Sequence, residues 1–279
     1  MFSRRLFLGH TLFLLTACQT AESPKLGKLT IGAVSYGEAE RSLEQYSPLR
    51  DHLSAQLKAI IELEPAFNEV RALEQIQQKV WSLVFAPPGL AAIAISQERY
   101  APLFPLEGVE TLRAVIVMRE ESPIKKLSDL DGKVIALGQV GSATGYYLPI
   151  YNLYGLTLAE VRFAPTPKTM LQWIEKEEVA AGAMSLAELT QYSSQFNPTK
   201  FRVIYIGSVP PGAILVSPTI ELNQQEQIRK ALLSASQNAI ASAGYLPNAT
   251  VPNYKQLIEA VARVRAISQR LKEKPARLY

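Results

Sequence analysis

The chain has 279 residues, of which 48% are hydrophobic and 19% charged. This composition is typical of a globular protein and not of a disordered one. The formal net charge is +4 and no run of basic residues is longer than Lys125–Lys126, so nucleic acid is not an expected partner. Cys18 is the single cysteine, which excludes an internal disulfide and a metal site built from a cysteine cluster.

Residues 1–17 are predicted to be an export signal, because Arg4 and Arg5 precede a short apolar stretch that ends in small residues. A helix that spans a membrane needs about 20 apolar residues, so an uncleaved membrane anchor is the less favoured alternative. Ser3–Leu8 resembles a twin-arginine signal, which is an address read by an export receptor. Gly9 stands where that signal usually has lysine, so the general secretory route stays open.

The end of this segment, Leu15–Cys18, resembles a bacterial lipobox. The resemblance implies that the chain is cleaved before Cys18 and that lipid is attached to its sulfur. Residues 18–27 are short and polar, and they are predicted to be the lipidated tether.

The rest of the chain alternates predicted strands with predicted helices. Strands are expected over 29–34, 60–67, 80–86, 100–105, 111–119, 133–138, 160–164, 179–185, 201–207 and 213–216. Helices are expected over 48–57, 70–80, 90–95, 146–154, 169–178, 186–194, 224–242 and 254–271. Alternation at these lengths predicts an α/β fold in which each sheet is mostly parallel and flanked by helices. Because the alternation occurs twice, we expect two lobes: 28–112 plus 213–279 in lobe 1, and 113–212 in lobe 2.

One stretch, Gly141–Pro149, stands at a predicted strand-to-helix turn and holds two hydroxyls and two glycines. A helix start leaves about four N–H groups without partners and carries a partial positive charge, so it suits a small oxyanion. The alternative is that Ser142 or Thr144 only caps the helix. Pro149 cannot bond to the Gly145 carbonyl, which predicts a kink in the first turn.

Three loops follow predicted strands: Ser35–Glu38, Pro87–Leu90 and Gly141–Tyr146. Ligands of open parallel sheets bind off the carboxyl ends of the strands. Since the first two loops belong to lobe 1 and the third to lobe 2, we expect all three to face one cleft between the lobes.

Five segments of the chain carry a resemblance to one family. The most specific is Ser142–Pro149, which matches the pattern S-x-[ST]-G-x-x-x-P. The others are Leu29–Gly32, Tyr46–Leu53, Val115–Ile124, and Leu127–Ala136 with its L-x-D-L-x-G-K pattern. Together they resemble the substrate-binding lipoproteins of phosphate, phosphite and phosphonate ABC importers (PhnD-like), which are type II periplasmic binding proteins. The resemblance covers nearly all of the chain after the tether.

The resemblance implies that Ser142, Thr144 and the backbone of Ala143 and Gly145 hold the oxygens of the ligand, with Tyr36 closing on the same group. Three neighbours in the predicted cleft complete the set of candidate ligand-binding residues: Pro88, Tyr146 and Ser185.

Three departures from the family pattern are visible. Leu90 stands in the place of a second tyrosine, Pro167 in that of a histidine, and Ser185 in that of an acidic residue. The ammonium of an aminophosphonate would need that carboxylate in a desolvated cleft. A smaller oxyanion, or one with an uncharged tail, is therefore the expected ligand.

By this resemblance the protein is a monomeric, lipid-anchored protein of the periplasm or cell envelope. It would deliver its oxyanion to an ABC permease in the inner membrane, without a cofactor, a metal or catalysis. Arg119 could supply a counter-charge, although a surface role is favoured. The main alternative is a diverged sensory or accessory lipoprotein. A hydrolase built on His52 is disfavoured, because no nucleophile motif accompanies it.

Overall fold

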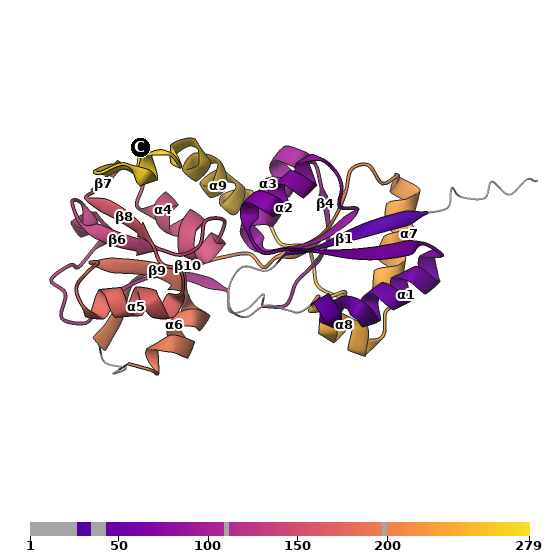
Figure 1. Ribbon diagram of the computed structural model, residues 1–279, viewed down its shortest axis with the longest axis horizontal. Helices are drawn as coiled ribbons and strands as arrows, with labels where there is room; N and C mark the ends of the chain where they lie inside the picture. The colour runs from indigo at the N-terminus through magenta and orange to yellow at the C-terminus, as the bar shows by residue number, and fades with distance from the viewer. Residues whose placement is uncertain (1–26, 35–42, 109–111, 197–199) are drawn as a thin grey trace, which may run out of the picture.

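Two sheets of five strands each organise the computed structural model, which describes residues 27–34, 43–108, 112–196 and 200–279. The two sheets lie side by side along the long axis of the molecule, each in its own lobe (Figure 1). The prediction of a two-lobed α/β fold with mostly parallel, helix-flanked sheets is confirmed. No helix in these described ranges is long and apolar enough to cross a bilayer.

The sheet of lobe 1 has the strand order β2-β1-β3-β11-β4, and only β11 runs antiparallel to its neighbours. Its strands are β1 (Lys28–Val34), β2 (Ile60–Ala66), β3 (Leu83–Ala86), β4 (Ala101–Pro105) and β11 (Ala213–Val216). Its helices are α1 (Ser47–Leu57, after the 3-10 turn Leu43–Tyr46), α2 (Glu69–Gln77), α3 (Pro88–Glu98), α7 (Leu222–Leu233) and α8 (Gln237–Ala243). Alternate side chains of the strands meet α1, α7 and α8 on one face, and α2 and α3 on the other.

The sheet of lobe 2 has the order β10-β5-β9-β6-β8, in which only β5 runs against its neighbours. Its strands are β5 (Arg113–Arg119), β6 (Val134–Leu137), β8 (Glu160–Phe163), β9 (Ala181–Ser185) and β10 (Phe201–Ser208). Its helical elements are the 3-10 turn η2 (Leu127–Leu130), the π-helix η3 (Ala143–Tyr147), α4 (Leu148–Asn152), α5 (Pro167–Glu175) and α6 (Leu186–Ser193). In each lobe the reversed strand is the first one after the chain crosses from the other lobe.

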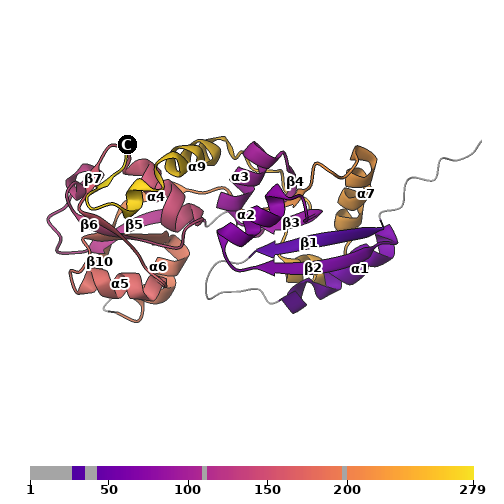
Figure 2. The ribbon, with the colours of Figure 1, turned by 45° about the horizontal axis from the view of Figure 1, so that its top comes forward.

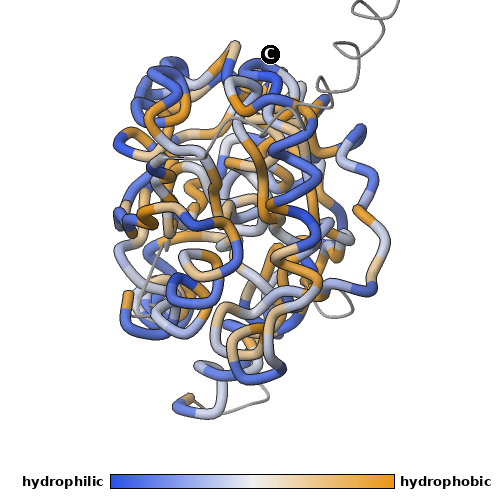
Figure 3. The backbone as a smooth tube through the Cα atoms, turned by 90° about the vertical axis from the view of Figure 1, so that its right-hand side faces the viewer, coloured by the Kyte–Doolittle hydropathy of each residue, from blue (hydrophilic) through white to orange (hydrophobic). Residues whose placement is uncertain are grey.

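The predicted helix 224–242 is two helices, because α7 ends at Leu233 and α8 begins at Gln237. The side chain of Ser236 accepts a hydrogen bond from the N–H of Ala239 at 3.2 Å. A serine that bonds to the backbone in this way favours a helix start over a helix interior. Viewed from the end of lobe 1, hydrophilic positions gather on outer loops and on outward helix faces (Figure 3).

The C-terminal segment joins the two lobes. Helix α9 (Lys255–Ile267) packs against α3 of lobe 1 and against α4 and η3 of lobe 2 (Figures 1 and 2). After the 3-10 turn Arg270–Lys272, strand β12 (Ala276–Arg277) pairs with β7 (Thr157–Leu158). The sequence assigned all of 213–279 to lobe 1, whereas the structure ties the end of this range to lobe 2. Buried apolar side chains of α9 are the physical reason, because they fill the space between the lobes.

Candidate functional site

The turn between β6 and α4 is a π-helix that begins after Ser142. The N–H groups of Tyr147 and Leu148 bond five residues back, to the carbonyl oxygens of Ser142 and Ala143. Pro149 has no N–H for the Gly145 carbonyl, which instead accepts from the N–H of Gly138 at 2.9 Å. The predicted irregularity at Pro149 is therefore present, and it takes the form of a widened turn.

Two hydroxyls lie at the start of this turn. The Ser142 Oγ caps the helix by accepting from the N–H of Gly145 at 2.9 Å, and it lies 3.2 Å from the Thr144 Oγ1. A hydroxyl that accepts one bond still has its proton to donate. Within the described residues, no acceptor faces the N–H groups of Ala143 and Thr144. The turn thus offers both hydroxyl and backbone donors to an incoming oxyanion.

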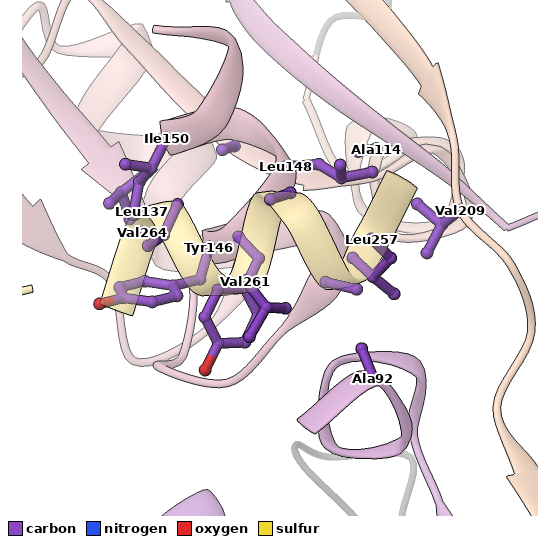
Figure 4. Close-up of a cluster of buried hydrophobic side chains, with 14 of the residues drawn as sticks. Ala92, Ala114, Leu137, Tyr146, Leu148, Ile150, Val209, Leu257, Val261 and Val264 are labelled. Atoms are coloured by element: carbon purple, nitrogen blue, oxygen red, sulfur yellow. The ribbon is translucent and has the colours of Figure 1, made fainter. Parts of the chain in front are cut away.

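These donors line a cleft of about 280 Å³. Six of the predicted residues lie in its wall, namely Pro88, Ser142, Ala143, Thr144, Gly145 and Ser185. The structure does not bring Tyr146 to the cleft. Its ring is 3% exposed and packs edge-on against Tyr147, with a centroid distance of 5.1 Å, beneath α9 (Figure 4). Tyr36 and Cys18 lie outside the residues that the structure describes.

Four helix starts converge on the cleft. The residues that precede α3, η3, α5 and α6 are Pro87, Ser142, Thr166 and Ser185, and all four line its wall. Each helix presents the positive end of its dipole there. No lysine or arginine is among the described lining residues, so donors to an anion come from backbone groups and uncharged polar side chains, and Glu188 is the one charged side chain of this described wall.

Three polar residues of the wall were not predicted, namely Gln139, Thr166 and Glu188. The side chain of Thr166 accepts from the N–H of Thr169 at 3.1 Å, and Glu188 forms a capping box with Ser185. Both follow strands of lobe 2, β8 and β9. Ligands of open parallel sheets bind off the carboxyl ends of the strands. Applying this rule to every predicted strand, and not only to three loops, would have found Thr166. Met170 and Met184 add an apolar wall beside these groups.

The lobes also meet beside the cleft, through Glu69. The hydroxyl of Tyr147 donates to the Glu69 Oε1 at 2.5 Å, and the Arg265 Nη1 lies 3.8 Å from the same oxygen. Glu69 is 5% exposed, and burial raises the pKa of its carboxyl. Burial, together with the nearby Glu69, also raises the pKa of Tyr146 to about 12 and that of Tyr147 further. Both tyrosines are therefore neutral at physiological pH, and Tyr147 is a donor.

Two other candidate residues lie elsewhere. Arg119 pairs with Glu121 and Glu177 and does not line the cleft. The Nε2 of His52 lies 2.8 Å from the Ala231 carbonyl oxygen, where α1 packs on α7. Its position is structural. Among the described residues, no group of three or more His, Cys, Asp or Glu side chains is placed to hold a metal ion.

The two lobes and the cleft between them have the fold of type II periplasmic binding proteins. A model of the periplasmic substrate-binding proteins of phosphonate ABC transporters matches residues 31–267. The chain belongs to this family, which is a family of transporter binding proteins and not of enzymes. The family is extracytoplasmic.

Solved structures share the fold at low sequence identity. XAC2383 from Xanthomonas citri, bound to ATP, has a TM-score of 0.70 at 20% identity, over 86% of this chain and 98% of that one. PhnD1 from Prochlorococcus marinus, in complex with methylphosphonate, has a TM-score of 0.64 at 15% identity, over 88% and 100%. A binding protein of an ABC phosphonate transporter from Pseudomonas aeruginosa has a TM-score of 0.60 at 11% identity, over 88% of each chain. No curated protein matches the sequence.

Proposed function

We propose that this protein captures a small oxyanion of the phosphate, phosphite or phosphonate type in the cleft and delivers it to the permease of an ABC importer. The observation that carries the proposal is the convergence of four helix starts on a cleft whose described wall has no basic side chain. Oriented N–H and O–H donors can hold an oxyanion and release it again without a covalent step. Closure of two lobes over such a ligand would present it to the membrane partner.

The wall of the cleft favours an oxyanion with a short, uncharged tail. The hydroxyls of Ser142 and Thr144 face the same cavity as the apolar side chains of Met170 and Met184. Methylphosphonate, the ligand of the Prochlorococcus marinus relative, has this combination of groups. Glu188 is the charged side chain of the described wall, and its Oε2 accepts from the N–H and the Oγ of Ser185. These bonds do not neutralise the carboxylate, so the case against an aminoalkyl phosphonate rests on Ser185, which stands where the family resemblance leads us to expect an acidic residue.

Replacing Thr144 with valine should weaken the binding of methylphosphonate by about 1–3 kcal/mol, because a charged ligand loses a donor in a buried position. The side chain keeps nearly the same volume, so the fold should not change. Calorimetric titration checks the affinity, with Thr190→Val as the matched control, since Thr190 is exposed on α6 and its hydroxyl donates to the Leu186 carbonyl oxygen. Equal affinities of Thr144→Val and the unaltered protein would place the ligand elsewhere.

We also propose that the protein is anchored by lipid on Cys18, within the Leu15–Cys18 segment. Cys18→Ser should accumulate as an uncleaved precursor and incorporate no labelled fatty acid in the expressing cell. Ser23→Ala serves as the control and should be processed and labelled normally. Labelling of Cys18→Ser at the level of the control would refute the lipid attachment.

A second candidate function, a sensory or accessory lipoprotein, rests on Leu90. The residue stands where the family resemblance leads us to expect a tyrosine, and its side chain is fully buried in the core, outside the cleft wall. Loss of a ligand-binding tyrosine fits a cleft that has changed its ligand or serves to pass a signal. A phosphorus oxyanion that binds tightly would favour the importer over this alternative.

A further inference from the structure

The contact between the lobes at Glu69 differs from the usual role of an acidic residue in a first helical turn. Such a residue normally stabilises its own helix start from the surface. Asn68 already caps α2 by accepting from the N–H of Arg71 at 2.9 Å. The Glu69 carboxyl instead reaches Tyr147, which belongs to the same five-residue turn as Thr144 and Gly145.

Few hydrogen bonds stabilise the ionised form of the Glu69 carboxyl. Its Oε2 is buried and has no hydrogen-bond partner among the described residues. The backbone of Gly141 lies against it so closely that a methyl group there would come within 2.3 Å of this oxygen. A buried carboxylate with an unbonded oxygen is costly, whereas a neutral carboxylic acid is much less so.

Few charges face this carboxyl. From η3 come the phenols of Tyr147 and Tyr146, and from α9 comes Arg265, whose charge is partly exposed. On α2 itself, Arg71 pairs with Glu64 and Glu74. From α3 the backbone of Gly89 packs against the Gly141 carbonyl and the Tyr147 ring. Among the described groups, Arg265 is thus the one cation whose charge acts on Glu69, and it lies 3.8 Å away.

We infer that Glu69 is a positioning residue that holds lobe 1 against the anion-binding turn of lobe 2 in its protonated form and loosens this contact when it ionises. The part of the inference that concerns the anion rests on the proposed function of the turn. The contact between the lobes is argued from its own geometry and does not depend on which ligand binds.

The sign of the pH effect follows from burial. The pKa of Glu69 is raised while the contact is formed, and it returns to its ordinary value when the lobes separate and water reaches the carboxyl. The contact is therefore fully stabilised below the ordinary carboxyl pKa, and this stabilisation is lost as the pH rises through the raised value. Arg265 acts in the opposite direction, because its charge favours the ionised form.

Small-angle scattering of the purified protein without ligand tests the contact at about pH 5 and about pH 8. The radius of gyration of the unaltered protein should increase at the higher pH. Glu69→Gln should lose this increase, since the amide does not ionise. Arg265→Gln should enlarge it, since the ionised carboxyl loses its cation. The control is Glu98→Gln, a partly buried carboxyl that pairs with Lys79 inside lobe 1 and should behave as the unaltered protein does.

A pH response that Glu69→Gln retains would overturn the inference, and so would an unaltered protein whose scattering is the same at both pH values. Arg265→Gln keeps the test decisive if Glu69→Gln fails to fold, because an unchanged or smaller response in that variant also contradicts the inference.

Binding of phosphate and methylphosphonate at the same two pH values separates the two proposals. The affinity should fall at the higher pH in the unaltered protein and fall less in Glu69→Gln. Ionisation of the ligand itself affects both proteins equally, so the difference between them reports on Glu69. If neither anion binds while the scattering behaves as expected, the proposed function fails and the contact stands. If an anion binds but the scattering of Glu69→Gln follows that of the unaltered protein, the contact fails and the function stands.

Discussion

Leu257→Ala should lower the free energy of unfolding by about 2–5 kcal/mol, the usual range for a large side chain removed from a well-packed core. Leu257 is 1% exposed on α9, and it lies in the cluster that includes Ala92 of lobe 1 and Ala114 of lobe 2 (Figure 4). The lobes on either side are held by their own sheets, so we expect them to collapse only partly onto the space left by the missing side chain.

Urea denaturation checks this result, with Leu222→Ala as the control. Leu222 is 82% exposed at the start of α7, so its truncation should change stability by less than about 0.5 kcal/mol. Similar losses for the two variants would show that α9 does not bind the lobes together as its contacts indicate.

Gly141→Ala should destabilise the protein by about 2–5 kcal/mol, because two costs act on the same residue. The backbone of Gly141 is left-handed, with φ of 97°, and an added methyl group would lie 2.3 Å from the Glu69 Oε2 and 2.8 Å from its Cβ. The methyl group would force α2 away from the turn. We therefore expect the variant to lose affinity for methylphosphonate as well as stability, which thermal unfolding and calorimetry measure.

Gly132→Ala is the matched control for backbone strain. Its φ is 69°, and an added methyl group would meet nothing within 4 Å. It should cost only about 1–2 kcal/mol, the strain of a left-handed alanine, and leave anion affinity unchanged. If the two variants were equally destabilised and bound the anion equally well, the packing of Gly141 against Glu69 would be without consequence.

The features that depend on local chemistry could be predicted from the sequence. Alternation of apolar residues marked the strands and helices of both lobes, because side-chain period follows directly from backbone geometry. The missing N–H of Pro149 predicted an irregular first turn, and the structure has a π-helix there. The loops after β3 and β6 were expected at one cleft, and Pro88 and Ser142 do line the same cavity.

The features that depend on distant partners could not be predicted. Strand β12 has two residues, and its partner β7 lies far back in the chain, so no local pattern marks either. Glu69 follows an asparagine cap and has the sequence signature of an ordinary helix start; only the approach of lobe 2 gives its carboxyl another role. Tyr146 and Tyr147 are adjacent in the sequence. A π-helix changes the direction in which successive side chains point, and here it is Tyr147 that reaches Glu69 of lobe 1.

The most direct test of the central claim is calorimetric titration of the purified protein with phosphate, phosphite, methylphosphonate, 2-aminoethylphosphonate and sulfate, with ATP added to the panel because a structural relative binds it. The predicted result is submicromolar binding of one phosphorus oxyanion, with the compound recovered unchanged after the titration. If none of these compounds bound, or if ATP alone bound, the result would contradict a cleft that binds a small phosphorus oxyanion.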